Sequence, residues 1–202
     1  MFILAVGRIG VGKNFVCDLL QKKWFPGAGY IDIGDVVSKI AHAKRNEREK
    51  LQNEITKHKD PDWLFKELEK TIYSKRTGGF LHHKGPNDAK TDVMIMSGLR
   101  EPYLLYRLMD TYKEDFLMLR LDTDDYIRYC RLCSRDEYLS AAQFEEFNER
   151  DSRLGLDILM DMDPAEIISF NGLTILDVQA NNAVEKLLDH TLHLQGFKKQ
   201  EE

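Results

Sequence analysis

The residues best suited to chemistry lie close to residue 1, in the segment Gly7-Arg8-Ile9-Gly10-Val11-Gly12-Lys13-Asn14. The segment fits G-x-x-x-x-G-K-[ST] at every position but the last, where Asn14 replaces a serine or threonine. Glycines let several backbone N–H groups converge on a phosphate, and Lys13 adds a cation. An apolar run (2–6) precedes the segment and a helical pattern (13–23) follows it, which is the context of a phosphate-binding loop. We therefore expect Gly7 to Phe15 to hold nucleotide phosphates, with a glycine-rich turn and a solvated lysine as the alternative.

A second candidate is Arg100, which follows another apolar run that ends in glycine, DVMIMSG (92–98). Open parallel sheets bind ligands outside the carboxyl ends of their strands, and a planar guanidinium suits two hydrogen bonds to a phosphate. We expect Arg100 to bind the phosphate of an acceptor; a solvent-exposed arginine at a helix start is the alternative. Arg150 and Arg153 are further candidates, although both could pair with the acidic residues Glu145, Glu146 and Glu149.

The segment 123–136 has helical spacing and carries arginines along one stripe. At about 100° per residue, Arg128 and Arg135 project within about 20° of each other and Arg131 about 60° to one side. Such a stripe needs anions opposite it, and either phosphates or acidic side chains would serve. The opposite, apolar face carries Tyr126, Ile127, Cys130 and Cys133. We expect both cysteines to pack in the core, because no second pair or nearby histidine completes a metal site.

Two carboxylates, Asp32 and Asp35, follow the strand predicted in GYIDIGD (29–35) and so belong to the same edge of the sheet. A carboxylate there can orient water bound to Mg²⁺ or accept a proton from an acceptor hydroxyl. Asp32 is the candidate base for an alcohol acceptor, whereas a phosphate acceptor is already anionic and hardly needs a base. Asp35 has an equally good role as the cap of the following helix.

Strands and helices alternate along the chain. Strands are expected at 2–6, 29–35, 92–98, 115–121 and 166–170, with a further one at 173–177. Helices are expected at 13–23, 35–58, 62–73, 101–111, 123–136 and 181–194. The segment 74–90 is expected to be a loop, and 136–150 a polar stretch. The alternation predicts βαβ units and hence an α/β fold with a parallel sheet.

The composition is that of an ordinary globular protein. The chain has 202 residues, of which 43% are hydrophobic and 31% charged, and this suits one domain with a large core. A net charge of −5 argues against binding duplex nucleic acid, which favours a basic excess. The sequence has no signal-peptide pattern and no apolar run of membrane-spanning length, and its three cysteines form no disulfide framework. We expect a cytoplasmic protein with no membrane partner.

Five segments share an order with a known family. They are GRIGVGKNFV (7–16), IDIGDVV (31–37), DVMIMSGLREPY (92–103), RYCRLCSRDEY with FEEFNERDSR (128–153) and IISFNGLTILD (167–177). In this order the chain resembles P-loop kinases of the nucleoside monophosphate kinase group, including adenylate-kinase-like, deoxynucleoside monophosphate kinase and dephospho-coenzyme A kinase relatives. The first segment is a specific match, and the others gain weight from their order.

The resemblance implies a three-layer P-loop NTPase fold, with a mostly parallel five-stranded sheet and helices on both faces. It implies a single domain over 1–202 with an acceptor-binding insert at 38–91 and a lid at 136–150, using ATP and Mg²⁺ to phosphorylate a nucleoside or deoxynucleoside monophosphate. The site residues expected are Lys13, Arg100, Arg131, Arg135 and Asp35 for catalysis; Gly7 to Phe15 and Asn171 for the nucleotide; Asp32, Asp35, Arg100 and Arg150 for the acceptor; and Asn14, weakly, for Mg²⁺.

Two positions depart from the family pattern and leave the activity open. Asn14 replaces the usual Ser or Thr, and Ser97 stands where many relatives carry an aspartate; both positions normally act on Mg²⁺. The alternatives to a nucleoside monophosphate kinase are therefore a dephospho-coenzyme A kinase-like enzyme and a nucleotide-binding protein with weak or no kinase activity. A kinase of nucleic-acid ends is a lesser alternative, because the net charge is acidic. The expected partners are small nucleotides, and a homodimer is left open.

Overall fold

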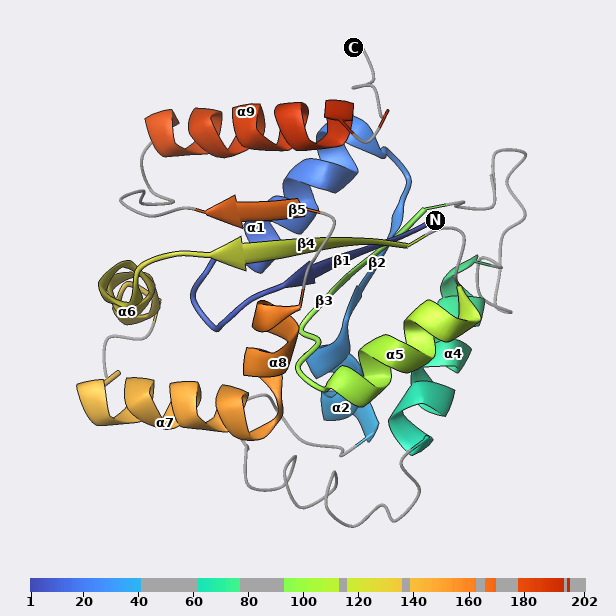
Figure 1. The fold of residues 1–202 in the computed structure, drawn as a ribbon, viewed down its shortest axis with the longest axis horizontal. Helices are drawn as coiled ribbons and strands as arrows, with labels where there is room; N and C mark the ends of the chain where they lie inside the picture. The colour runs from blue at the N-terminus through green and yellow to red at the C-terminus, as the bar shows by residue number, and fades with distance from the viewer. Residues whose placement is uncertain are drawn as a thin grey trace.

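The computed structural model describes residues 1–40, 62–76, 93–112, 116–135, 139–162, 166–169, 178–194 and 196. Its elements in chain order are β1 (Phe2–Val6), α1 (Lys13–Leu19), a π-helical turn (Leu20–Trp24), β2 (Gly29–Asp32), α2 (Ile33–Ile40), α4 (Trp63–Arg76), β3 (Met94–Ser97), α5 (Pro102–Thr111), β4 (Phe116–Asp122), α6 (Asp125–Cys133), α7 (Ala141–Arg153), α8 (Leu156–Asp161), β5 (Glu166–Ser169) and α9 (Val178–Leu194). Figure 1 shows their arrangement.

The strands form one five-stranded sheet in the order β2-β3-β1-β4-β5, and every neighbouring pair is parallel. All five residues of the central strand β1 are buried, as expected of a strand covered on both faces. Ala5 pairs with Ser97, and Ser97 pairs with Asp32, so the carboxyl ends of β1, β3 and β2 lie level with one another. The predicted phosphate loop, Arg100 and Asp32 therefore start from the same edge of the sheet.

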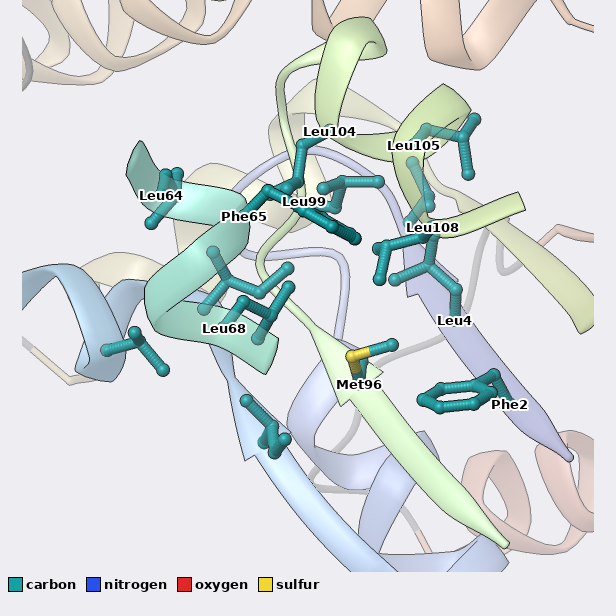
Figure 2. Packing of buried hydrophobic residues seen from close by; sticks show 14 of the residues in the cluster. Phe2, Leu4, Leu64, Phe65, Leu68, Met96, Leu99, Leu104, Leu105 and Leu108 are labelled. Carbon is teal, nitrogen blue, oxygen red and sulfur yellow. The ribbon is translucent and has the colours of Figure 1, made fainter. Parts of the chain in front are cut away.

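Helices cover both faces of the sheet, and the side chains of β1 alternate between two cores. Phe2, Leu4 and Val6 join the core under α2, α4, α5 and α8, whereas Ile3 and Ala5 join the core under α1 and α9. Figure 2 shows the first core, in which leucines of α4 and α5 meet Phe2, Leu4 and Met96. Helices α6 and α7 lie beyond the carboxyl end of β4 (Figure 1). This packing fixes the sheet edge from which the loops emerge.

The predicted α/β fold with a parallel sheet is confirmed. The predicted strand at 173–177, most of the predicted loop 74–90 and helical residues 41–58 lie outside the described residues, as does most of the expected acceptor insert. Helices α7 and α8 were not predicted. Helix α7 begins with a capping box between Ser140 and Gln143, and its apolar stripe has Phe144 and Phe147 buried. Among the described residues, no helix has both the length and the apolar character needed to cross a membrane.

The orientation predicted for α6 is wrong. Tyr126 is 73% exposed and Cys130 is exposed, whereas Arg128 is only 1% exposed. The reason is polar compensation: the Arg128 guanidinium donates to the carboxylate of Asp125, to Ile9 O at 3.0 Å and to Asn148 Oδ1 at 3.0 Å. It also lies over the ring of Phe144. Arg128 therefore packs α6 between the phosphate loop and α7, while Cys130 faces outward and Cys133 is half-buried against the small cluster around Leu139 and Phe144.

Candidate functional site

The segment between β1 and α1 forms a tight loop that depends on its glycines. Gly10 and Gly12 adopt φ values of 82° and 104°, in the left-handed region that favours glycine. A Cβ at Gly10 would lie 2.9 Å from the carbonyl oxygen of Arg128. Gly12 caps α1 without any side-chain hydrogen bond, so the first N–H groups of the helix are not claimed by a cap. The loop therefore presents backbone donors of the kind that bind phosphate.

Lys13 folds back along this loop. Its Nζ donates to Gly7 O at 2.6 Å and to Arg8 O at 2.9 Å. Burial, together with the positive charge of Arg100, lowers the pKa of Lys13 to about 7, although Asp151 and Asp32 act in the opposite direction. A bound phosphate would add negative charge and raise this pKa. The loop thus holds a cation whose charge responds to an anionic ligand.

Arg100 and Arg150 meet at one carboxylate, that of Asp151. Arg100 Nε donates to Asp151 Oδ1 at 2.7 Å, and Arg150 Nη2 donates to the same oxygen at 3.3 Å. The backbone N–H of Ile9 donates to Asp151 Oδ2 at 3.3 Å. Burial alone would raise the pKa of Asp151, but Arg100, Arg150 and Lys13 outweigh it and hold that pKa below its usual value. The carboxylate is therefore ionised at neutral pH.

Two further arginines join the loop to other elements of the fold. Arg131 of α6 donates from Nη1 to Val11 O at 3.1 Å and to Gly10 O at 3.4 Å, and burial lowers its pKa. Arg8 of the loop forms an ion pair with Asp157 of α8. Arg135 follows the end of α6 and is exposed. Of the two arginines in 123–136 that were expected to take part in catalysis, Arg131 and Arg135, the structure brings only Arg131 against the loop.

The two predicted carboxylates have different surroundings. Asp32 ends β2, is 8% exposed and accepts from the backbone N–H of Gly34 at 2.8 Å. Its Oδ1 would lie 3.0 Å from a Cβ at Gly98, where φ is +84°, so the chain after β3 passes close to this carboxylate. Asp35, in the first turn of α2, is exposed. Asp32 therefore belongs to the site edge, whereas Asp35 faces outward.

The two positions that depart from the family pattern share one partner. The hydroxyl of Tyr30 lies 2.7 Å from Ser97 Oγ and donates to Asn14 Oδ1 at 3.5 Å. Ser97 is fully buried, and Asn14 is exposed. Among the described residues, no group of three His, Cys, Asp or Glu side chains is placed to hold a metal ion. The side-chain oxygens of Asn14 and Asp32 are of the kind that could hold Mg²⁺ arriving on nucleotide phosphates, because Mg²⁺ prefers oxygen ligands and keeps several waters.

The structure gathers most of the predicted residues around the loop and adds some that sequence reasoning missed. Phe15 packs against the core under α1, and Asn171 lies outside the described residues. The missed residues are Asp151, Tyr30 and Asp157. A signal for Asp151 existed: it follows Phe144 and Phe147 at helical spacing, which places an acidic side chain on the apolar stripe of α7.

Comparison with known proteins places the fold. No protein-family model and no curated protein sequence matches the chain. Among solved structures, a shikimate kinase from Bacteroides thetaiotaomicron superposes with a TM-score of 0.58 at 13% identity, covering 96% of this chain and 98% of that one. A gluconokinase from Sinorhizobium meliloti 1021 gives 0.50 at 16% identity, with 96% and 95% covered. A tunicamycin resistance protein from Deinococcus radiodurans gives 0.53 at 13% identity, with 100% and 98% covered.

These likenesses concern the fold, because the identities are low. The chain has the α/β fold of P-loop kinases, with a parallel sheet flanked by helices, and this agrees with the sequence-based expectation. The expected subgroup, the nucleoside monophosphate kinases, is a finer statement than the fold supports.

Proposed function

We propose that the protein is an ATP-dependent phosphotransferase whose acceptor is a small molecule carrying a phosphate, in the first instance a nucleoside or deoxynucleoside monophosphate. The observation that carries the proposal is the convergence of Lys13, Arg100 and Arg150 beside a glycine-rich loop. Phosphoryl transfer asks a protein mainly for positioning and for positive charge around the transferring group. The site offers both.

The roles follow from where each group starts. The loop and Lys13 would hold the phosphates of ATP, with Arg131 beside the loop carbonyls. Arg100 and Arg150, which reach the site from other elements, would hold the acceptor phosphate. Mg²⁺ would arrive with ATP and neutralise charge on its phosphates. The side-chain oxygen of Asn14 is the loop oxygen that would hold the ion.

A hydroxyl acceptor is the second candidate, and Asp32 favours it. This carboxylate is nearly buried at the carboxyl edge of the sheet, where it could accept the proton of an attacking hydroxyl. Two of the structural neighbours, a shikimate kinase and a gluconokinase, are named for acceptors that are not nucleotides. On this reading the enzyme would be dephospho-coenzyme A kinase-like or would act on another small alcohol.

The test is a coupled assay of ADP release with Mg²⁺-ATP over all nucleoside and deoxynucleoside monophosphates, dephospho-coenzyme A, phosphomevalonate, shikimate and gluconate. We expect turnover of about 1–100 s⁻¹ with at least one acceptor, as is typical of kinases. Lys13→Met should abolish it, whereas Lys22→Met, an exposed lysine paired with Asp18, should not. Turnover only with a hydroxyl acceptor would favour the second candidate, and none with any acceptor would refute both.

The remaining alternative, a nucleotide-binding protein with negligible transfer, makes a different prediction. It requires tight binding of ATP or ADP by calorimetry in the absence of turnover. In that case Asn14→Thr combined with Ser97→Asp should raise the transfer rate, because the pair restores a hydroxyl and a carboxylate for Mg²⁺.

A further inference from the structure

The carboxylate of Asp151 is a buried junction between three parts of the site. Its residue is 0% exposed, yet it lies on α7, a helix that begins some forty residues after β3. Its donors are the backbone of Ile9 in the phosphate loop, Arg100 in the segment after β3, and its own neighbour Arg150. One carboxylate thus touches the nucleotide loop and both arginines assigned to the acceptor.

The contacts with Asp151 use only one nitrogen of each guanidinium group. Arg100 engages Asp151 through Nε, and Arg150 through Nη2 alone. Their remaining guanidinium nitrogens have no hydrogen-bond partner within the described part of the chain. The side chains of Arg100 and Arg150 are 24% and 23% exposed, so solvent reaches them while Asp151 stays buried. A phosphate could therefore bind both arginines without displacing the carboxylate.

Charge explains why a carboxylate is needed here. Lys13, Arg100 and Arg150 carry like charges, and burial together with the positive charge of Arg100 lowers the pKa values of both Lys13 and Arg150. A buried anion between them offsets that repulsion and holds the guanidinium planes in place. The ring of Phe147, over which Arg150 lies, restricts that arginine further.

We propose that Asp151 is the positioning residue of the acceptor-phosphate site: it holds Arg100 and Arg150 side by side and ties them to the nucleotide loop through Ile9 N–H. The proposal rests on the proposed function, since it assumes that these arginines bind a phosphate. In this role Asp151 acts through the two arginines and would not itself contact the reacting atoms.

The experiment is a double-mutant cycle on phosphate binding. The dissociation constant of inorganic phosphate is measured by calorimetry on ADP-saturated protein for the wild type, Asp151→Asn, Arg100→Ala and the double variant. We expect Asp151→Asn to weaken phosphate binding at least tenfold when Arg100 is present and by less than twofold in the Arg100→Ala background. The proposal would be overturned if Asp151→Asn weakened phosphate binding by the same factor with and without Arg100. It would also be overturned if Asp151→Asn bound phosphate as tightly as the wild type or more tightly.

A spectroscopic readout separates positioning from general stability. In proton–nitrogen spectra of arginine side chains, the Arg100 Nε–H should exchange slowly in the wild type and be lost to fast exchange in Asp151→Asn. The matched control is Glu149→Gln, which removes the same charge from an exposed position on α7. It should retain the Nε–H signal and wild-type phosphate affinity; loss of either in this control would count against the proposal.

A second variant covers the case in which Asp151→Asn fails to fold. If Asp151→Asn does not fold, Asp151→Glu replaces it in the cycle, because it keeps the charge and displaces it by one methylene. Asp151→Glu should then bind phosphate more weakly than the wild type, whereas Asp151→Glu combined with Arg100→Ala should bind it as well as Arg100→Ala alone. The cycle measures binding and not turnover, so a protein that phosphorylates none of the acceptors screened would refute the proposed function without deciding the role of Asp151.

Discussion

The ammonium group of Lys13 donates to two loop carbonyls while burial and Arg100 lower its pKa to about 7. The ammonium group is therefore close to losing its proton at neutral pH, and the negative charge of a bound phosphate would raise its pKa again. The same balance of charges governs Asp151, which stays ionised although it is fully buried. At the scale of single residues, the site is a set of mutually dependent charges.

This dependence gives nucleotide binding a pH dependence. Above pH 7 Lys13 is increasingly neutral in the free protein. If ADP binds the protein with Lys13 charged, binding then requires the uptake of a proton. We expect the dissociation constant of ADP to rise between pH 7 and 9, by at most about tenfold per pH unit. Calorimetry in buffers of different ionisation enthalpy measures the proton directly. Lys13→Met should lose the proton uptake and Lys22→Met should keep it; a constant affinity from pH 6.5 to 9 in the wild type would contradict the expectation.

Tyr30→Phe tests the contact between the two unusual positions. The variant removes the hydroxyl that lies beside Ser97 and Asn14 and leaves the buried Ser97 Oγ without that partner. We expect a loss of about 1 kcal/mol of stability, seen as a melting temperature lower by about 2–4 °C. Tyr106→Phe, on an exposed tyrosine of α5, should not change the melting temperature. Equal melting temperatures for both variants would show that the hydroxyl contributes nothing.

At the scale of elements, α6 and α7 show how a polar side chain can take a core position. Helix α6 faces the loop with Arg128 and Leu132, and α7 covers them with Phe144. The helical projection from sequence placed Arg128 opposite the apolar face of α6, because hydrophobicity alone ranks cysteine and tyrosine above arginine for burial. Only the hydrogen bonds to Asp125, Ile9 and Asn148 make the arginine acceptable inside.

Arg128→Met should therefore destabilise the fold, although methionine is more hydrophobic than arginine. It removes charge-assisted hydrogen bonds from a nearly fully buried site, for an expected loss of about 2–4 kcal/mol. Urea unfolding measures this loss. Arg153→Met, at the exposed end of α7, should stay within about 0.5 kcal/mol of wild type. A stable Arg128→Met protein would show that apolar packing alone joins α6 to the loop.

At the scale of the whole molecule, α8 connects the hydrophobic core to the phosphate loop. Helix α8 follows α7 through Gly155, whose φ is +92°, and it packs against α5. Through Asp157 the same helix reaches the loop residue Arg8. The turn at Gly155 therefore sets the direction of α8 and so the position of Asp157 beside the phosphate loop.

A matched pair of glycine variants measures the importance of that turn. A Cβ at Gly155 would lie 2.7 Å from Pro102 Cδ, whereas Gly27, with φ of +86°, has nothing within 4 Å. Gly27→Ala should cost about 1 kcal/mol from backbone strain alone, and Gly155→Ala about 2–4 kcal/mol because overpacking adds to it. Urea unfolding compares the two. Equal costs would mean that Pro102 moves aside freely.

The amino-acid sequence determined by itself what depends on neighbours along the chain: buried strands, a glycine-rich loop followed by lysine, and the alternation that makes a parallel sheet. These features are local, so Lys13 and Arg100 could be proposed as site residues without a structure. The tertiary structure alone decided which face of α6 is buried and that Asp151, Tyr30 and Asp157 join the site. Those choices depend on charges and hydrogen-bond partners that lie far apart in sequence and meet only when the sheet edge, α7 and α8 assemble.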